Sequence, residues 1–248
     1  MTKAFDEKAR KELESVYRPD DFSDVKISSL QVRKIEVRHA RPYIATFHYS
    51  KTMPDSTRFA FGLFFDRRIV GVCTFGMGCG KNQYTSVISD IQNGQYIELT
   101  RLWIEDTVGR NAESFFISRC IKMLPKQIKL IISFSDEKQG HVGTIYQATN
   151  FYYLGKNSGG GKMLKGSDGI EKHPRLLGIY RMRHKELKDM TNAQLMEMLG
   201  YEYVSAGAKH KYAITRDKHT RSILKSMSLP YPKLDSGYKQ TQKHKEEA

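Results

Sequence analysis

One continuous apolar run, IKLIISFS at residues 128–135, constrains the fold of this chain more than any other segment. A short run of this kind is typical of a strand that is buried inside a sheet. It is followed by GHVGTIYQATNFYYLG at residues 140–155, where a glycine-lined turn leads into a helical pattern over 144–149 and then into a tyrosine-rich strand. Strand, helix and strand in this order predict parallel strands joined by a crossover helix.

Three more strands and a longer helix are predicted upstream of that run. The segment RFAFGLFFDRRIVGVCTFG, residues 58–76, reads as a hairpin that turns at Asp66, and QYIELTRLWI, residues 95–104, reads as a third strand. A helix begins after Asn111, a residue type that caps helix N-termini, and Pro125 ends it. The order β-β-β-α-β-α-β predicts the mixed α/β class, with a central mixed sheet flanked by helices.

The remaining segments suggest one domain. Residues 1–236 are expected to fold as a single domain, with a core at about 30–183 and a basic C-terminal extension at 184–236. Residues 237–248 are expected to form a flexible basic tail. Residues 79–94 and 156–169 are polar and contain glycine, and we expect both to be loops.

The N-terminal residues, 1–17, form a charged helical pattern and do not resemble a signal peptide. No apolar run reaches the roughly 20 residues that a membrane span needs. The three cysteines show no paired spacing, which suits a reducing compartment. A cytoplasmic protein without a membrane partner is therefore expected.

The charge balance indicates a polyanionic partner. The chain has 41 Lys and Arg against 27 Asp and Glu, a formal net charge of +14. A basic chain of this kind favours nucleic acid as the partner. The alternative is a basic protein whose charge serves only solubility.

The segments ELTRLWI and IYQATNFYYLG, in this order of elements, resemble the fold of the GCN5-related acyltransferases (GNAT). In that fold the helix after the ELTRLWI-type strand binds the coenzyme A pyrophosphate. Here VGRNAES replaces the usual glycine-rich loop, but backbone N–H groups at a helix start can still hold a phosphate. The resemblance implies six cofactor-binding candidates: Arg101, Arg110, Asn111, Ser114, Gly143 and Thr144.

A more specific resemblance covers roughly residues 47–233. The blocks GRNAESFFISRCIKMLP, SFSDEKQGHVGTIYQATNFYYLG and KHKYAITRD, followed by LPYPK, together resemble the phage Mom family of DNA adenine-modification proteins. The resemblance implies that adenine N6 in double-stranded phage DNA is converted to a carbamoylmethyl (acetamido) form, which shields the DNA from restriction. It also implies acetyl-CoA or another small donor, and possible use of iron.

Five residues are candidates for catalysis: His48, Tyr49, Ser50, Asp136 and Tyr146. The neutral imidazole of His48, before the hairpin, can act as a base. The alternative is a structural role, which is usual for a His-Tyr pair such as His48 and Tyr49 at a helix end. Asp136 directly follows the buried strand, where a carboxylate can accept a proton or cap the next turn. A tyrosine near position 146 protonates the leaving thiolate in many GNAT enzymes; core packing is the alternative.

Other polar residues are candidates for metal or DNA binding. His48, Asp136 and His141 would make a set of two histidines and one carboxylate, which suits non-haem iron. Glycines at Gly140 and Gly143 let backbone approach a ligand, with Thr144 as a cap. The substrate and DNA candidates are Ser135, His141, Asn150, Tyr152, Lys209, His210 and Tyr212.

Purely structural alternatives remain open for several of these residues. Arg101 can bind an anion or the adenine, or form an ordinary ion pair with Glu98. The segment KHKY, which begins at Lys209, is either a solvated edge strand or a DNA contact, and Tyr152 either packs or stacks. Two other functions fit the same sequence: a conventional acyl-CoA-dependent N-acyltransferase acting on a protein or small-molecule amine, and a non-catalytic DNA-binding protein.

Overall fold

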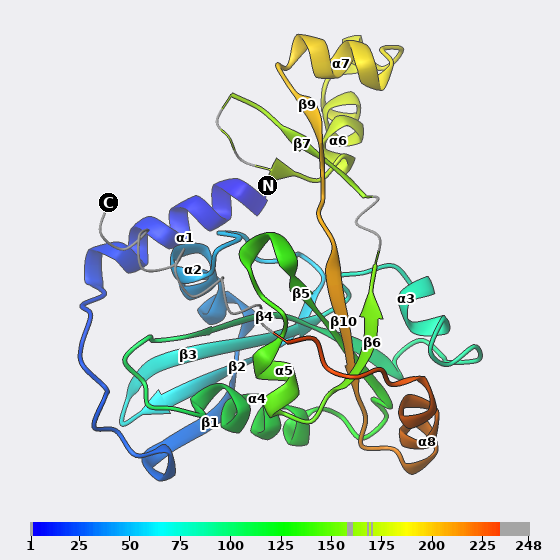
Figure 1. Ribbon diagram of the computed structural model, residues 1–248. Coiled ribbons are helices and arrows are strands. Elements are labelled where there is room, and N and C mark those ends of the chain that lie inside the picture. Colours follow the sequence, from blue (N-terminus) through cyan, green and yellow to red (C-terminus); the bar gives the residue numbers. More distant parts are fainter. Residues whose placement is uncertain (1, 158–160, 168, 170, 234–248) are drawn as a thin grey trace. The chain divides into compact units, whose positions relative to one another are not determined.

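The computed structural model describes residues 2–157, 161–167, 169 and 171–233 (Figure 1). The chain divides into two compact units, each discontinuous in sequence. The first comprises Met1–Phe134, Gly143–Gly155 and Lys211–Lys233, and the second comprises Ser135–Val142, Lys156–His210 and Leu234–Ala248. The single domain over 1–236 stays a prediction, and the tail at 237–248 lies outside the described residues.

A seven-stranded mixed sheet is the framework of the first unit. Its order is β1-β2-β3-β4-β5-β10-β6, and its strands are β1 (Leu30–Ile35), β2 (Thr57–Phe65), β3 (Arg68–Gly76), β4 (Tyr96–Ile104), β5 (Leu130–Asp136), β6 (Tyr152–Lys156) and β10 (Lys209–Ile214). The first four strands pair antiparallel, whereas β4 and β5 pair in parallel. The predicted mixed α/β class and the buried strand are therefore confirmed.

The helices also follow the predicted order. They are α1 (Thr2–Val16), α2 (Val37–Phe47), α3 (Asn82–Thr85), α4 (Ala112–Met123), α5 (Thr144–Ala148) and α8 (Lys218–Met227), with a 3-10 turn η1 (Ile27–Ser29). The hairpin of β2 and β3 turns at Asp66, whose φ of 54° is the left-handed conformation that Asp tolerates in turns. In the described part of the chain, no helix combines the length and the apolar character needed to cross a membrane.

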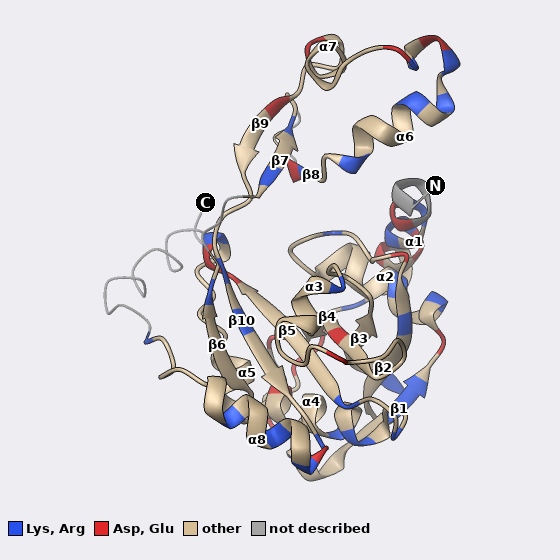
Figure 2. Ribbon diagram, turned by 90° about the vertical axis from the view of Figure 1, so that its right-hand side faces the viewer, with Lys and Arg blue, Asp and Glu red and all other residues tan. Residues whose placement is uncertain are grey.

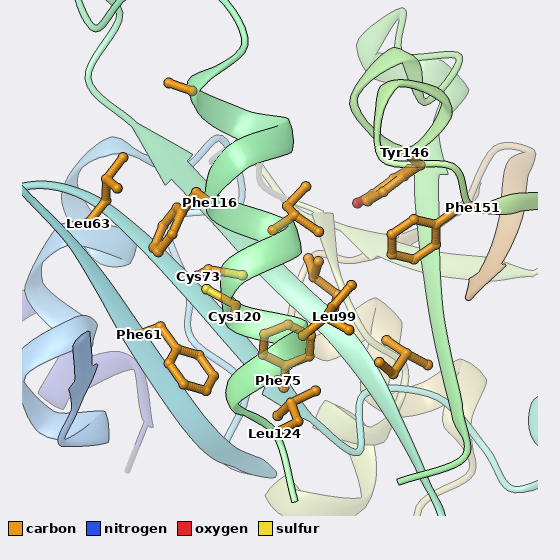
Figure 3. Close-up of a cluster of buried hydrophobic side chains, with 14 of the residues drawn as sticks. Phe61, Leu63, Cys73, Phe75, Leu99, Phe116, Cys120, Leu124, Tyr146 and Phe151 are labelled. Carbon is orange, nitrogen blue, oxygen red and sulfur yellow. The ribbon is translucent and has the colours of Figure 1, made fainter. Parts of the chain in front are cut away.

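Helices α2 and α4 cover opposite faces of the sheet. Phe116 and Cys120 of α4 pack against Phe61 and Cys73 in the main core cluster (Figure 3). A second cluster joins Ala40 and Ile44 of α2 to Ala60 and Val72, the immediate chain neighbours of Phe61 and Cys73. Successive side chains on a strand point to opposite faces, so each helix buries one face of the same strands.

Several local predictions were wrong. The expected loop at 79–94 contains α3, and the one at 156–169 contains β7 (Lys162–Lys165). Asn111 precedes α4 with a left-handed backbone (φ 68°), and its side chain makes no capping hydrogen bond. The edge-strand interpretation of KHKY is also wrong, because β10 lies between β5 and β6.

The second unit is a small α/β module. Its elements include a three-stranded sheet in the order β8-β7-β9, with β8 (Glu171–Lys172) and β9 (Glu202–Ser205), and the helices η2 (Glu137–Gln139), α6 (Arg175–Arg183), η3 (Lys185–Leu187) and α7 (Asn192–Met198). Its core is formed by Leu164, Leu177 and Leu195, each no more than 1% exposed. Thr191 and Gln194 form a capping box that begins α7, as their spacing in sequence favours.

Candidate functional site

The candidate site begins where strands β4 and β5 separate. Their parallel pairing runs from Tyr96↔Leu130 to Glu98↔Ile132. Beyond it, a side chain makes the connection: the Ser133 hydroxyl donates to the Leu99 carbonyl at 2.9 Å. The backbone ladder between β4 and β5 thus opens at this point, and the Ser133 side chain bridges the two strands just beyond it.

A β-bulge in β4 determines which side chains face that opening. The register against β3 passes from Phe75↔Leu99 to Thr74↔Arg101, so Thr100 is the extra residue. In a regular strand, residues 98 and 101 would point to opposite faces; the bulge puts Glu98 and Arg101 on the same face. The Thr100 hydroxyl lies 2.9 Å from the Thr74 hydroxyl, which holds the bulge in place.

Arg101 is fixed by main-chain carbonyls. Its Nε donates to the Thr52 carbonyl at 3.0 Å and its Nη1 to the Thr100 carbonyl at 2.7 Å. Burial lowers the pKa of Arg101, while the nearby Tyr49, Glu98 and Tyr146 act to raise it. A guanidinium remains charged in proteins. The result is a positioned cation with donors in a rigid fork.

The segment after α2 joins this arrangement through Thr52. The Ser50 hydroxyl donates to the Thr52 carbonyl at 3.2 Å and lies 2.9 Å from Nδ1 of His48. The Ser50 backbone N–H also donates to that Nδ1, at 3.1 Å, so a neutral His48 carries its proton on Nε2. The Thr52 carbonyl therefore connects the predicted residues His48 and Ser50 to Arg101.

Tyr49 extends the same segment toward solvent. Its side chain is 52% exposed, whereas that of His48 is 9% exposed. The two rings lie 4.3 Å apart between centroids. An exposed tyrosine beside a buried imidazole provides an aromatic surface next to polar, hydrogen-bonded groups.

Tyr146 of α5 supplies a proton donor. Its ring is buried, and its centroid lies 5.3 Å from that of Phe151 and 5.3 Å from that of Tyr212. Figure 3 shows Tyr146 beside Phe151. Burial raises the pKa of the Tyr146 phenol well above its usual value, against a hydrogen bond with Ser133 that lowers it. At neutral pH the hydroxyl is protonated. Because Ser133 also bonds to Leu99, Tyr146 is tied to the opening between β4 and β5.

Gly143 has a packing role in this structure. Its φ is 78°, and a Cβ at this position would collide with the ring of Tyr212. Tyr212 is completely buried, so it is not available to stack on a base. Cofactor binding by Gly143 stays a prediction. Thr144 is exposed, and Gly143 occupies the N-cap position without any side-chain cap.

Replacing Gly143 by alanine should lower the free energy of unfolding by about 3 kcal/mol, the sum of left-handed strain and overpacking against Tyr212. Denaturant unfolding measures the change. Gly94→Ala is the matched control, because Gly94 has a φ of 87° and no atom within 4 Å. We expect about 1 kcal/mol there. Equal losses in the two variants would contradict the packing role of Gly143.

Ser135, Asp136 and His141 form a turn of the second unit. Asp136 Oδ1 accepts the backbone N–H of Lys138 at 3.0 Å, so the capping alternative for this aspartate is confirmed. The Ser135 hydroxyl donates to the carbonyl of His141, whose side chain is exposed. A catalytic role for Asp136 stays a prediction.

The structure gives the expected iron site no support. Within the described ranges, no group of three or more His, Cys, Asp and Glu side chains is placed to hold a metal ion. His48 belongs to the first unit, whereas Asp136 and His141 belong to the second.

The other predicted residues have mainly local partners. The Ser114 hydroxyl donates to the Asn111 carbonyl at 3.1 Å, and Arg110 is exposed. Asn150 takes a left-handed backbone (φ 60°) in the turn after α5, and Tyr152 is half-buried. The Lys209 backbone donates to Asn157 Oδ1 at 2.8 Å.

His210 does not fit the DNA-contact prediction. It is 5% exposed, so its ring is covered by protein and not presented to solvent. Burial lowers the pKa of His210, while Glu137, at 4.0 Å from Nε2, acts to raise it. A neutral, covered imidazole is poorly suited to contacting phosphate.

Two functional groups were missed by sequence reasoning. Ser133 interrupts the apolar run 128–135, and a hydroxyl in a buried strand must find a partner, which is a signal that we could have used. Thr52 contributes only its carbonyl, which no side-chain pattern reveals. Both positions link the predicted residues into one hydrogen-bonded arrangement.

Comparisons with known proteins cover most of the chain. Residues 29–233 match the Mom protein family. The methylcarbamoylase Mom of Escherichia phage Mu is 35% identical over 131 residues, which cover 52% of this chain and 54% of that protein. The chain thus spans about half the length of this curated relative.

Solved acetyltransferases show weaker similarity. A putative phosphinothricin N-acetyltransferase matches with a TM-score of 0.43 and 12% identity, over 77% of this chain and 100% of that chain. YncA, a putative acetyltransferase from Salmonella typhimurium solved with acetyl-CoA, matches with a TM-score of 0.42 and 8% identity, over 77% of this chain and 96% of that chain.

Proposed function

Because the chain belongs to the Mom protein family, we propose that it is a transferase that modifies adenine in phage DNA inside the host cell. The proposed product carries a carbamoylmethyl group on adenine N6, in keeping with the name of the phage Mu relative. The observation that carries the proposal is the joining of Arg101 and Tyr146 to the opening between β4 and β5, within the family-matched residues.

Double-stranded DNA is the proposed substrate. The +14 net charge favours a polyanion. Adenine N6 is conjugated with its ring and lies inside the duplex, so the base must leave the stack before reaction. Once outside, the base needs an aromatic or apolar surface, and the exposed ring of Tyr49 beside His48 offers one.

The roles of the side chains follow from their protonation and charge. The N6 nitrogen forms a bond to an electrophilic carbon of the donor while the bond from that carbon to its leaving group breaks. N6 then releases one proton to water, and water returns a proton to Tyr146 after the step. Tyr146, protonated at neutral pH, donates a proton to the leaving group. Arg101 stabilises negative charge that develops there, and His48, with its accepting Nδ1 already bonded, orients the segment that carries Tyr49.

The product identity restricts the donor. The acetyl group of acetyl-CoA contains no nitrogen, so its transfer would give N6-acetyladenine. A carbamoylmethyl product requires a donor, or a donor and an amine together, that supplies the CH2–CO–NH2 unit. The first turn of α4 suits a phosphate of an acyl-CoA donor in part: Arg110 is exposed and no side chain caps the helix, but Glu113 adds a negative charge.

Mass spectrometry of nucleosides tests the proposal. DNA from cells that produce the protein should contain N6-carbamoylmethyladenine, which differs in mass from N6-acetyladenine by one NH group. Detection of N6-acetyladenine instead would still indicate a DNA adenine transferase, but one that uses an acetyl donor. Unmodified DNA together with acetylated protein or small-molecule amines would indicate a conventional acyltransferase. Unmodified DNA with salt-sensitive DNA binding alone would indicate a non-catalytic DNA-binding protein.

A further inference from the structure

The outward face of α6 carries side chains that the proposed chemistry does not use. At 3.6 residues per turn, Arg175, Ile179, Met182 and Arg183 lie on one side of this helix together with Gly178. Met182 is 82% exposed, a higher value than for any other large hydrophobic side chain in the described ranges, and Ile179 is 39% exposed. Their exposure leaves both apolar side chains of this face available to a partner.

The opposite side of α6 is anchored within the second unit. Leu177 is buried against Leu164 and Leu195. Arg181 donates from Nε to the Met190 carbonyl at 2.9 Å and from Nη2 to Asn192 Oδ1 at 2.6 Å. The helix is therefore held on one side and presents Met182 from a fixed scaffold.

The charged side chains of α6 itself are all positive, and Glu186 follows two residues after its C-cap, His184. Residues 172–185 contain five Lys and Arg and no Asp or Glu. Both arginines of the outward face, Arg175 and Arg183, are exposed. Figure 2 shows the Lys and Arg positions along α6 in blue. An apolar side chain between two cations complements a ligand that has anionic edges and a stacked apolar interior, which describes duplex DNA.

We infer that this face binds duplex DNA, with Arg175 and Arg183 on phosphates and Met182 inserted between neighbouring bases. Apolar side chains that enter a base step unstack it, and flanking arginines hold the backbone. The inference rests on the proposed function, since a transferase that acts on adenine N6 needs a base out of the stack. It adds the element that helps to open the duplex.

Fluorescence of 2-aminopurine tests the insertion. The probe is a pool of duplexes with 2-aminopurine in place of adenine between randomised flanking bases, whose emission rises when the base unstacks. Met182→Ala in the full chain should reduce the protein-induced rise at least about tenfold, the effect expected when an unstacking wedge is removed. Its dissociation constant should stay within about threefold of wild type, as for a surface substitution. Met198→Ala, which changes a 50% exposed methionine of α7, should leave both unchanged.

A second duplex pool distinguishes the loss of an inserted Met182 side chain from a general defect in DNA binding. When 2-aminopurine faces an abasic position it is already partly unstacked, and Met182→Ala should then behave within about twofold of wild type. The double variant Arg175→Ala/Arg183→Ala should instead weaken binding to both pools. The slope of log affinity against log salt concentration should become shallower by the amount that corresponds to about two phosphate contacts.

The outcomes distinguish this inference from the proposed function. Wild-type emission from Met182→Ala, or an equal loss in Met198→Ala, would overturn the insertion even if adenine is modified in cells. Unmodified adenine and no DNA binding by the wild-type protein would overturn both. Loss of binding in Arg175→Ala/Arg183→Ala to an acidic protein, with DNA binding intact, would assign the face to that partner instead.

Discussion

The Tyr146→Phe protein is expected to yield about 100-fold less modified adenine than the wild type, or lower still, the usual loss when a general acid is removed. The substitution keeps the ring that packs on Phe151 and Tyr212 and removes only the hydroxyl bonded to Ser133. Because burial holds the pKa of that phenol well above its usual value, the wild-type hydroxyl is protonated at neutral pH, as the proposed proton donor must be.

Tyr212→Phe is the matched control for Tyr146→Phe. Tyr212 is also completely buried, and its hydroxyl accepts from Gln147 Nε2 at 3.3 Å. Both variants lose one buried hydroxyl, so their melting temperatures should fall to a similar small extent, corresponding to about 1 kcal/mol. Only Tyr146→Phe should lose activity per folded molecule. Equal activities in the two variants would remove the proton-donor role from Tyr146.

Arg101→Met should also reduce the yield of modified adenine by about 100-fold, because the cation that stabilises developing negative charge is lost. Methionine has a similar length and an apolar stem, so it suits the partly buried position. Arg101→Lys should recover part of the activity, because it restores the charge without the forked donors. The measurement is the modified-adenine content of DNA per amount of folded protein.

Arg216 provides a control for the structural part of that loss. Its guanidinium likewise donates to main-chain carbonyls, those of Leu124 at 3.1 Å and Pro125 at 2.6 Å. Arg216→Met should therefore cost about 1–3 kcal/mol of stability, as when a buried acceptor loses its donor, and leave activity per folded molecule unchanged. If Arg101→Met were no less active than Arg216→Met, Arg101 would be an anchor for the Thr52 segment and nothing more.

Several elements of the first unit could be predicted because their signals are local, whereas β1 and α3 were missed. The hairpin of β2 and β3 has two β-rich runs around a turn at Asp66, and β5 is a short buried run followed by a helix start. Strand β7 was missed because glycines around 162–165 look like a loop in sequence. Its pairing with β9, about 40 residues away, is what makes it a strand.

The site was only partly predictable because its geometry depends on long-range packing. His48, Ser50, Arg101 and Tyr146 were all candidates, but the bulge at Thr100 that puts Arg101 on the face of Glu98 has no sequence signature. A glycine leaves space, which is why the sequence suggested that Gly143 approaches a ligand. In the structure the ring of Tyr212, from the distant strand β10, fills the space where a side chain at Gly143 would lie.

The role of Asp136 was also not predictable from the sequence, although its partner is only two residues away. A carboxylate after a buried strand fits both a catalytic base and a cap, and the sequence alone cannot separate them. The structure shows the cap, through the hydrogen bond from Lys138 N. Capping uses only one carboxylate oxygen of Asp136. Activity measurements on Asp136→Asn therefore still test whether this residue also acts as a catalytic base.

The most direct test of the central claim uses DNA labelled with heavy nitrogen only at the exocyclic amine of adenine. Purified protein is incubated with this duplex and the small-molecule fraction of a cell extract, and the nucleosides are analysed by tandem mass spectrometry. We predict a modified adenine whose CH2–CO–NH2 group is bonded to the heavy nitrogen, formed by the wild type and reduced to traces by Tyr146→Phe. Adenine that stays unmodified, or a new group on any other atom of the DNA, would contradict the proposed function.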